Sequence, residues 1–411
     1  MIAETGGPTI FLKESSPKDL LWQGLGFLSS KVCKNILTSI SPTVNFQTND
    51  VLSLPFIIDK TQGSITITKA LIEGYKADWD SFETSWDFNT LPILQQPAKT
   101  IAKSQEAADT ECMTRFAQMK QLEEENNRLF INAYDLQDEL TPEVLDDQIT
   151  LHRPDLGQDI KRLISYAIGC MMGRYSPDHP GLIYANSGND GFDPTQYKTF
   201  PADEDGIIPL LNTDWGIADD ATDRVVDFLK AIWPIESLEE NLFFISQSLG
   251  ATPKEPSRDV IRNYFSTSFY KDHLQKYKKR PIYWLFSSGK LKAFQCLVYL
   301  HRYNESTLSR MRTQYVHTIQ SLIAARIEQL EGDKLKATST SHRNKLQKEQ
   351  DGLKKQQEEL KSFEEKLKHA AERKIKLDLD DGVKVNYAKF TDNKYGEILA
   401  EVKAITGGSE E

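Results

Sequence analysis

Cysteine is scarce in this sequence, and the few cysteines lie far apart. They are Cys33, Cys112, Cys170 and Cys296, in a chain of 411 residues. None belongs to a CxxC pair or has a pair of histidines near it. This spacing argues against a zinc site and a disulfide framework, and it fits a reducing compartment. We therefore expect each cysteine to be a small buried apolar residue, and we expect no metal site.

Long hydrophobic runs are also missing. The longest, such as the run that ends at Leu300, fall far short of the roughly 20 apolar residues that a membrane helix needs. The first eight residues lack the basic segment and the apolar segment of a secretory signal. These features predict a cytoplasmic protein that has no membrane partner.

Signatures of common catalytic sites are absent as well. The sequence contains no GxGxxG or GxxxxGK[ST] loop, no GxSxG nucleophile elbow and no metalloprotease helix with paired histidines. It also lacks an Asn/Asp-Pro-Pro-aromatic tetrapeptide, the signature that holds a target adenine amino group for methyl transfer. We expect no catalytic, cofactor-binding or metal-binding residues in this chain.

Charge is distributed unevenly along the chain. The formal net charge is −10, yet the segment from Tyr270 to Arg302 contains eight Lys or Arg and one Asp. Within it, the basic run Lys276–Arg280 passes almost directly into the aromatic run Ile282–Phe286. Cationic and aromatic side chains in alternation are typical of nucleic-acid binding, because the cations neutralise phosphates and the aromatic rings stack on bases. The alternative is a buried strand whose alternate side chains form one face, preceded by lysines in solvent.

The region 186–259 is strongly acidic, with fifteen acids and five bases. It includes Asp219, Asp220 and Asp223, but it shows neither a partner histidine nor the ligand spacing of a Ca²⁺ loop. We expect these carboxylates to mark a solvated helix start, where negative charge complements the helix dipole.

Hydrophobic periodicity predicts an α+β fold with long helices. Alternating β-branched residues indicate a strand at Gly63–Thr68, and a stretch without Pro or Gly indicates a long helix from Ser104 to Leu140. Leucines recur every seven residues from Leu346 to Leu367, which is typical of a coiled-coil seam. A poor helix segment near Ser339 favours an antiparallel helical hairpin over one rod. Gln350 and Gln357 occupy would-be core positions, which argues against a stand-alone dimer.

The segment Lys278–Gly289, together with Tyr299–Tyr303, resembles the C-terminal region of the PglX family. These are the adenine-specific DNA methyltransferases of type 1 bacteriophage-exclusion (BREX) systems. Other segments match in collinear order, so that the resemblance extends from about residue 25 to 390. They are Asp80–Phe88, Leu136–Glu143, Ser165–Tyr175, Gly181–Tyr184 and Asp378–Tyr387.

The resemblance implies a role without catalysis for this chain. The family's S-adenosylmethionine fold and Asn-Pro-Pro-Tyr loop precede the matched region, and no position here matches them. The resemblance therefore implies the DNA-recognition and C-terminal part of a site-specific N6-adenine methyltransferase in phage defence, catalytically inactive alone. S-adenosylmethionine would be bound by the missing N-terminal part. The implied partners are double-stranded DNA, the catalytic methyltransferase part and other BREX proteins.

The patterns and the resemblance together suggest five parts. We expect a partial target-recognition subdomain at 1–100, a connecting helix at 101–145, a main α+β domain at 146–304, a helical hairpin that acts as a coiled-coil-like spacer at 305–377, and a tail at 378–411 that packs back on the body.

The candidate DNA-binding residues are the cations of the basic segment, one tyrosine beside them and two arginines at the start of the hairpin. Trp284 next to them is more often a core residue than a contact. The candidates are Lys276, Lys278, Lys279, Arg280, Tyr283, Lys290, Lys292, Arg302, Arg310 and Arg312.

A second hypothesis is a protein-interaction scaffold of the defence complex that makes no direct contact with DNA. The leucine seam and the acidic region would then dock other defence proteins. Acidic segments can also mimic DNA toward a basic partner. Binding of duplex DNA at low salt separates the two hypotheses.

Overall fold

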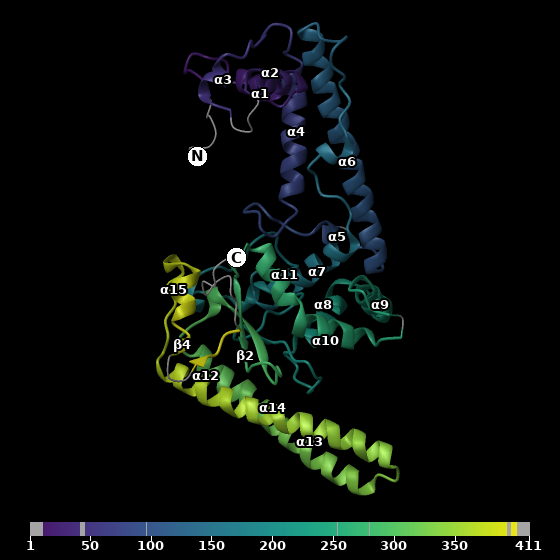
Figure 1. Ribbon diagram of the computed structural model, residues 1–411, viewed down its shortest axis with the longest axis vertical. Helices are drawn as coiled ribbons and strands as arrows, with labels where there is room; N and C mark the ends of the chain where they lie inside the picture. The colour runs from purple at the N-terminus through teal and green to yellow at the C-terminus, as the bar shows by residue number, and fades with distance from the viewer. Residues whose placement is uncertain are drawn as a thin grey trace. The chain divides into compact units, whose positions relative to one another are not determined.

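The structure is a computed structural model that describes residues 11–41, 46–95, 97–252, 254–278, 280–392 and 396–400. It is mostly helical, with a small three-stranded antiparallel sheet and two long adjacent helices near the C-terminus (Figure 1). The predicted α+β class and C-terminal helical hairpin are confirmed. None of the helices within these ranges has the length and apolar character that crossing a membrane requires.

The chain divides into two compact units. Unit 1 contains residues 1–82 and 106–154, and unit 2 contains residues 83–105 and 155–411. Each unit is therefore built from two separate stretches of sequence. The long helix α6 (Ile101–Ala133) begins in unit 2 and continues in unit 1.

Unit 1 is built from helices. They are α1 (Asp19–Leu28), α2 (Lys31–Ile40), α3 (Thr48–Leu52), α4 (Ser64–Trp79) and most of α6. Phe27, Val32 and Phe130 bring α1, α2 and α6 into one buried cluster. A Cβ atom at Gly26 would lie 2.6 Å from Thr68 Oγ1, so the absence of a side chain lets α1 pack directly on α4.

The strand predicted at Gly63–Thr68 is wrong, because these residues begin α4. The alternation of β-branched residues is short, whereas Ile67, Leu71 and Tyr75 recur every four residues along the same stretch. Ile67 is buried, and the other two pack against Phe116 and Met119 of α6. The longer helical period decides the structure, since it gives α4 a continuous apolar face.

The long helix predicted to reach Leu140 ends earlier, at Ala133. Asp135 adopts a left-handed backbone with φ of 55°, and the Leu136 N–H donates to Ile131 O at 3.0 Å. This six-to-one hydrogen bond is a Schellman cap, which satisfies a terminal carbonyl and turns the chain out of the helix.

Unit 2 surrounds a three-stranded antiparallel sheet. The strands β1 (Ile207–Pro209), β2 (Tyr283–Ser287) and β3 (Gln295–Tyr299) pair in the order β1-β3-β2, with Trp284 opposite Val298. Almost every residue of the three strands is buried, so the sheet lies in the core of the unit.

Helices enclose this sheet. One of them is α7 (Leu156–Met171), which is buried along most of its second half. The other helices before the C-terminal hairpin are α5 (Pro92–Gln95), α8 (Ala221–Ile232), α9 (Leu238–Ser248), α10 (Ser257–Thr267), α11 (Phe269–Lys276) and α12 (Thr307–Arg310).

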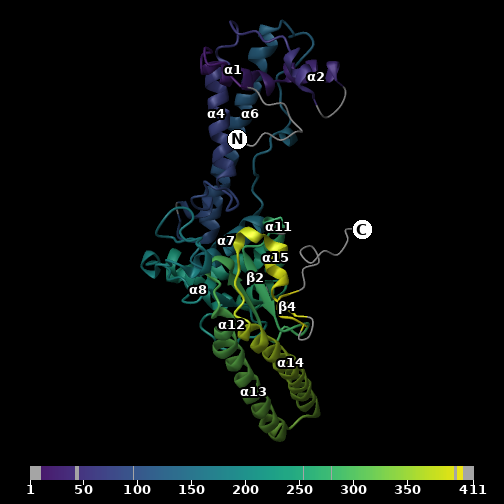
Figure 2. The same ribbon diagram turned by 90° about the vertical axis from the view of Figure 1, so that its left-hand side faces the viewer.

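The helical hairpin consists of α13 (His317–Lys336) and α14 (Thr340–Glu372). It follows a π-helical turn at Met311–Val316. The two helices lie side by side in both views (Figures 1 and 2), and Ser339 caps α14 by accepting from His342 N at 3.1 Å. The joint near Ser339 is thus confirmed.

Gln350 is buried in the seam of the hairpin with its polar groups satisfied. Its Nε2 donates to Ile327 O at 3.2 Å and to Glu331 Oε2 at 2.8 Å, and its Oε1 accepts from Lys334 at 2.8 Å. A satisfied polar group in the seam fixes the register of the two helices.

The C-terminal segment contains α15 (Val383–Ala388), with β4 (Thr391–Asp392) and β5 (Gly396–Glu397) after it. Tyr387 and Phe390 pack edge-on against Trp284, with ring centroids 5.4 and 5.6 Å apart. The Ala400 N–H also donates to Leu285 O at 2.8 Å. Residues 378–392 and 396–400 thus contribute to the core around β2, and residues 401–411 lie outside the described part.

The acidic helix start is not solvated as expected. Asp220 is 2% exposed, caps α8 by accepting from Thr222 N at 2.9 Å, and pairs with Arg262 Nη1 at 2.8 Å. The cysteines follow the prediction only in part, because Cys112 is half-buried and its thiol donates to His152 O at 3.1 Å.

Candidate nucleic-acid interface

The basic run lies where α11 ends and the chain turns into β2. Lys278 and Arg280 are exposed, and neither makes an ion pair with a described residue. Lys278 holds a left-handed backbone, with φ of 49°, just past the helix end, a position that glycine usually occupies. Lys279 lies outside the described residues.

Lys276 is held inside the fold. Its Nζ lies 2.9 Å from Oε1 of Glu83, a carboxylate that is only 7% exposed. This ion pair makes Lys276 a partner of the buried carboxylate rather than a free cation.

The aromatic run is core, as the alternative interpretation of the sequence predicts. Tyr283 is 2% exposed and stacks on His273 with ring centroids 4.8 Å apart. Trp284 is 1% exposed. Neither ring reaches the surface, so Tyr283 is removed from the surface candidates.

Arg302 is also buried, and its guanidinium ties the loop before β1 to β3. Its Nη1 donates to Asp203 O at 2.7 Å and its Nη2 to Glu204 O at 2.6 Å. The guanidinium carbon lies 3.7 Å from the ring centroid of Phe192. All of these contacts are internal, so Arg302 has a structural role.

Lys290 and Lys292 lie in the turn between β2 and β3, at the other end of the strand from Arg280. Five residues of strand separate the two groups by roughly 17 Å. Lys290 is exposed, whereas Lys292 Nζ donates to Ser266 O at 2.6 Å. Burial and the charge of Lys271 lower the pKa of Lys292. The basic residues of this segment therefore form two separate groups, one at each end of β2.

The two arginines at the start of the hairpin have partners. Arg312 Nε lies 2.5 Å from Glu364 Oε1 on α14, and Arg310 Nη2 donates to Asn304 Oδ1 at 3.3 Å. Both are half-buried, which makes them weaker candidates than Lys278 and Arg280.

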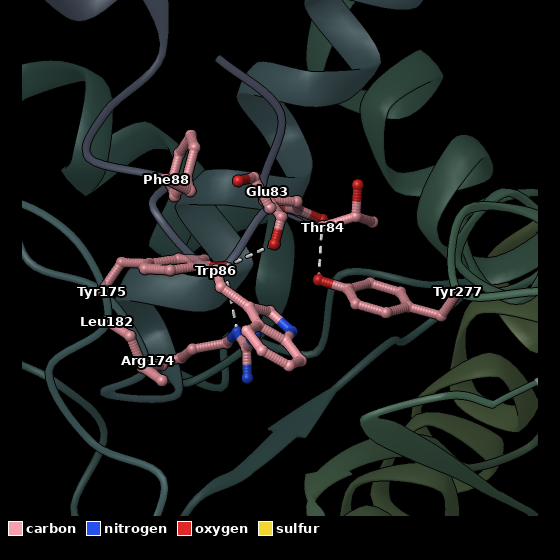
Figure 3. A pocket seen from close by; sticks show the side chains of 9 residues that line it. Glu83, Thr84, Trp86, Phe88, Arg174, Tyr175, Leu182 and Tyr277 are labelled. Atoms are coloured by element: carbon pink, nitrogen blue, oxygen red, sulfur yellow. Dashed lines mark hydrogen bonds between the residues drawn. The ribbon is translucent and has the colours of Figure 1, made fainter. Parts of the chain in front are cut away.

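A pocket of about 250 Å³ opens beside the end of α11 (Figure 3). It lies within unit 2, between the segment after Phe82, the end of α7 with the loop behind it, and Tyr277. The residues that line it are Glu83, Thr84, Ser85, Trp86, Phe88, Arg174, Tyr175, Leu182 and Tyr277.

Glu83 anchors one wall of this pocket as a carboxylate. Its Oε1 accepts from Lys276 Nζ at 2.9 Å, from Ser165 Oγ at 2.8 Å and from Tyr277 Oη at 3.2 Å. Burial raises the pKa of Glu83, but Lys276, Ser165 and Arg174 outweigh that effect and hold the pKa below its ordinary value. The charge of Glu83 is thus compensated inside the fold.

Arg174 supplies the other charge in the pocket. Its Nε donates to Tyr175 Oη at 3.0 Å and its Nη1 to Tyr299 Oη at 3.4 Å. Trp86 also lines the pocket and is entirely exposed, at 101%. The arrangement offers a flat ring and a guanidinium group to a ligand.

Within the ranges that the structure describes, no group of three or more His, Cys, Asp or Glu side chains is placed to hold a metal ion.

Comparison with known proteins gives two close matches to adenine methyltransferases. The chain is 41% identical to the adenine-specific methyltransferase BrxX of Escherichia coli O9:H4 (strain HS) over 435 aligned positions, which cover 99% of this chain and 35% of that protein. The chain is homologous to the PglX/BrxX methyltransferases. The adenine-specific methyltransferase PglX of Lacticaseibacillus casei (strain Zhang) is also 41% identical, over 89% of this chain and 31% of that protein.

The chain spans about a third of the length of these PglX/BrxX relatives. No protein-family model matches the chain. The homology over nearly the whole chain confirms the resemblance on which the sequence-based interpretation rests.

Segments that carry the resemblance to PglX/BrxX meet at the pocket. Asp80–Phe88 supplies Glu83 and Trp86, Ser165–Tyr175 supplies Arg174, and Gly181–Tyr184 supplies Leu182. The basic run contributes Lys276 and Tyr277 beside them. Periodicity and charge counts did not single out Glu83, Trp86 or Arg174. The partners of Glu83 are between 82 and 194 positions away in sequence, and Tyr299, one partner of Arg174, is 125 positions away. The local sequence feature that indicates this site is Trp86, which lies between two short polar residues.

Proposed function

We propose that this chain recognises double-stranded DNA for an N6-adenine methyltransferase of the PglX/BrxX type in BREX phage defence. The observation that carries the proposal is the 41% identity to adenine-specific methyltransferases along nearly the whole chain. Methyl transfer to a base in a duplex requires that the base leave the stack. Such an enzyme needs protein surface that grips phosphates and reads neighbouring base edges.

The exposed cations support a phosphate-binding role. Lys278 and Arg280 lie together where α11 gives way to β2, and Lys290 lies at the far end of that strand. Side chains with no internal partner can neutralise phosphates without first breaking an ion pair. Lys276, Lys292, Arg302 and Arg312 would have to break internal contacts to do so.

S-adenosylmethionine does not fit the residues that line this pocket. The lone carboxylate that lines the pocket, Glu83, already accepts three hydrogen bonds from within the fold. It is therefore not free to bind the cofactor's ribose hydroxyls or its positive charge. We assign the cofactor and the methyl-transfer chemistry to a part of the methyltransferase that has the motifs absent from this sequence.

A binding assay tests the proposal. The purified chain should shift a mixed-sequence duplex at about 50 mM salt, and the affinity should fall steeply toward about 200 mM as counterion release weakens. An absence of binding at the lower salt would contradict DNA recognition and would favour the protein-interaction scaffold.

A further inference from the structure

The exposed indole of Trp86 belongs to a segment whose backbone is held by buried side chains on both sides. Glu83 on one side of it is held by Lys276 and Ser165. Phe88 on the other side is 4% exposed and packs edge-on against Tyr175, with ring centroids 5.3 Å apart. Because both neighbours are buried, the backbone that carries this exposed ring is ordered before a partner binds.

Arg174 and Lys276 together outweigh the single carboxylate that lines the pocket, so the site carries net positive charge. Among the side chains that line it, Glu83 and Arg174 are the charged ones, and Glu83 is already paired with Lys276. Arg174 donates through Nε and Nη1 to two tyrosine hydroxyls, which fixes the plane of the guanidinium group. Its Nη2 donates to no residue in the described ranges, and Figure 3 shows Arg174 and Trp86 among the side chains that line the pocket. An anion that enters the pocket meets a positioned donor.

The size of the pocket restricts the ligand. Its volume of about 250 Å³ lies just below the range of roughly 300–1,000 Å³ that is typical of sites for drug-sized ligands. One ring system with an attached phosphate suits this volume better than a dinucleotide. Lys278 and Arg280, which follow the lining residue Tyr277 in the chain, are exposed and add positive charge near it in sequence.

We propose that this pocket binds one unpaired nucleotide of DNA, with the base stacked on Trp86 and a phosphate oxygen bound by Arg174. The inference rests on the proposed DNA-recognition function and adds a site for a nucleotide outside the duplex stack. Extrusion of a base leaves unpaired nucleotides in the substrate, so the DNA that this part recognises contains such a ligand. Aromatic stacking suits this role because every base has a π-face.

The test compares two duplexes that differ by one unpaired nucleotide. The chain should bind a duplex with a single-nucleotide bulge about 10-fold more tightly than the fully paired duplex, as expected for one base stacked on a ring. Trp86→Ala should abolish this preference and leave affinity for the paired duplex unchanged. Trp86→Phe should retain most of it.

A matched control is another exposed tryptophan of the same chain. Trp79, which is 64% exposed, lies at the end of α4, and Trp79→Ala should keep the preference for the bulged duplex. Equal affinity of the unaltered chain for both duplexes, or a preference that survives Trp86→Ala, would overturn the nucleotide site and leave DNA recognition intact. Binding to neither duplex would overturn both proposals.

Discussion

His273 shows at the residue scale how the surroundings of the basic run are built. It is 2% exposed, and its Nε2 accepts from the backbone N–H groups of Ile282 and Tyr283 at 3.2 and 3.3 Å. These bonds require the neutral ring and fix the chain as it enters β2. Burial lowers the pKa of His273 to about 3, so the folded state excludes a proton that the unfolded chain binds.

The pH dependence of stability follows from this difference. Below an unfolded pKa of about 6.5, the unfolded chain takes up a proton at His273, and the contribution of the residue declines progressively down to about pH 3. The decline amounts to about 1.4 kcal/mol per pH unit within that window. His273→Gln keeps an acceptor but does not titrate, so the stability difference between the unaltered chain and the variant should shrink as pH falls.

Urea unfolding of both proteins from pH 7 to pH 4 measures this effect. Asp203 acts in the opposite direction, because burial and the neighbouring Asp205 raise the pKa of its carboxyl to about 7. Asp203 is common to both proteins, so its contribution cancels in the difference. A stability difference that stays constant with pH would show that His273 is not a buried neutral base.

At the scale of elements, the helical hairpin also stabilises the turn between β2 and β3. Glu359 of α14 reaches the β2–β3 turn, where its Oε1 accepts from Ser288 Oγ at 2.8 Å and from Ala293 N at 3.2 Å, and its Oε2 accepts from Leu291 N at 2.8 Å. A Cβ atom at Gly289, where φ is 142°, would lie 2.8 Å from Glu359 Oε2. The carboxylate therefore determines the shape of the turn that presents Lys290.

Removal of this carboxylate should destabilise unit 2. Glu359→Ala leaves the turn donors without their acceptor, and we expect a decrease of about 1.5–3 kcal/mol in the free energy of unfolding, as for hydrogen bonds to a charged group. Urea denaturation checks the value. Glu358→Ala, at the exposed neighbouring position, should change stability by less than about 0.5 kcal/mol. Equal effects of the two substitutions would contradict the role of Glu359 in stabilising the β2–β3 turn.

Sequence patterns predict the long elements well and the short ones poorly. The helical hairpin follows from leucines that recur every seven residues along α14, whereas the core strand Tyr283–Ser287 is one of two interpretations that the sequence leaves open. The six-residue alternation at Gly63–Thr68 is too short to distinguish a strand from the start of α4. The end of α6 depends on a left-handed residue, Asp135, which no apolar pattern marks.

At the scale of the whole molecule, the candidate site depends on long-range contacts. The sequence shows where cations are concentrated, but only the fold distinguishes the exposed Lys278 and Arg280 from the buried Arg302. The Glu83–Lys276 pair joins residues 193 positions apart. Tertiary packing of this kind is invisible to periodicity, so the pocket could not be predicted even though several segments that form it carry the family resemblance.

The salt dependence of DNA binding tests the central claim most directly. Replacement of Lys278, Lys279 and Arg280 together by Ala should weaken binding to a paired duplex and reduce the log–log salt slope by about 0.9 for each phosphate that the variant no longer neutralises. A variant with the same reduction of charge, Lys336, Lys345 and Lys348 to Ala, removes exposed lysines near the joint between α13 and α14 and should leave the slope unchanged. An unchanged slope in the first variant, or an equal fall in both, would contradict DNA recognition through the end of α11.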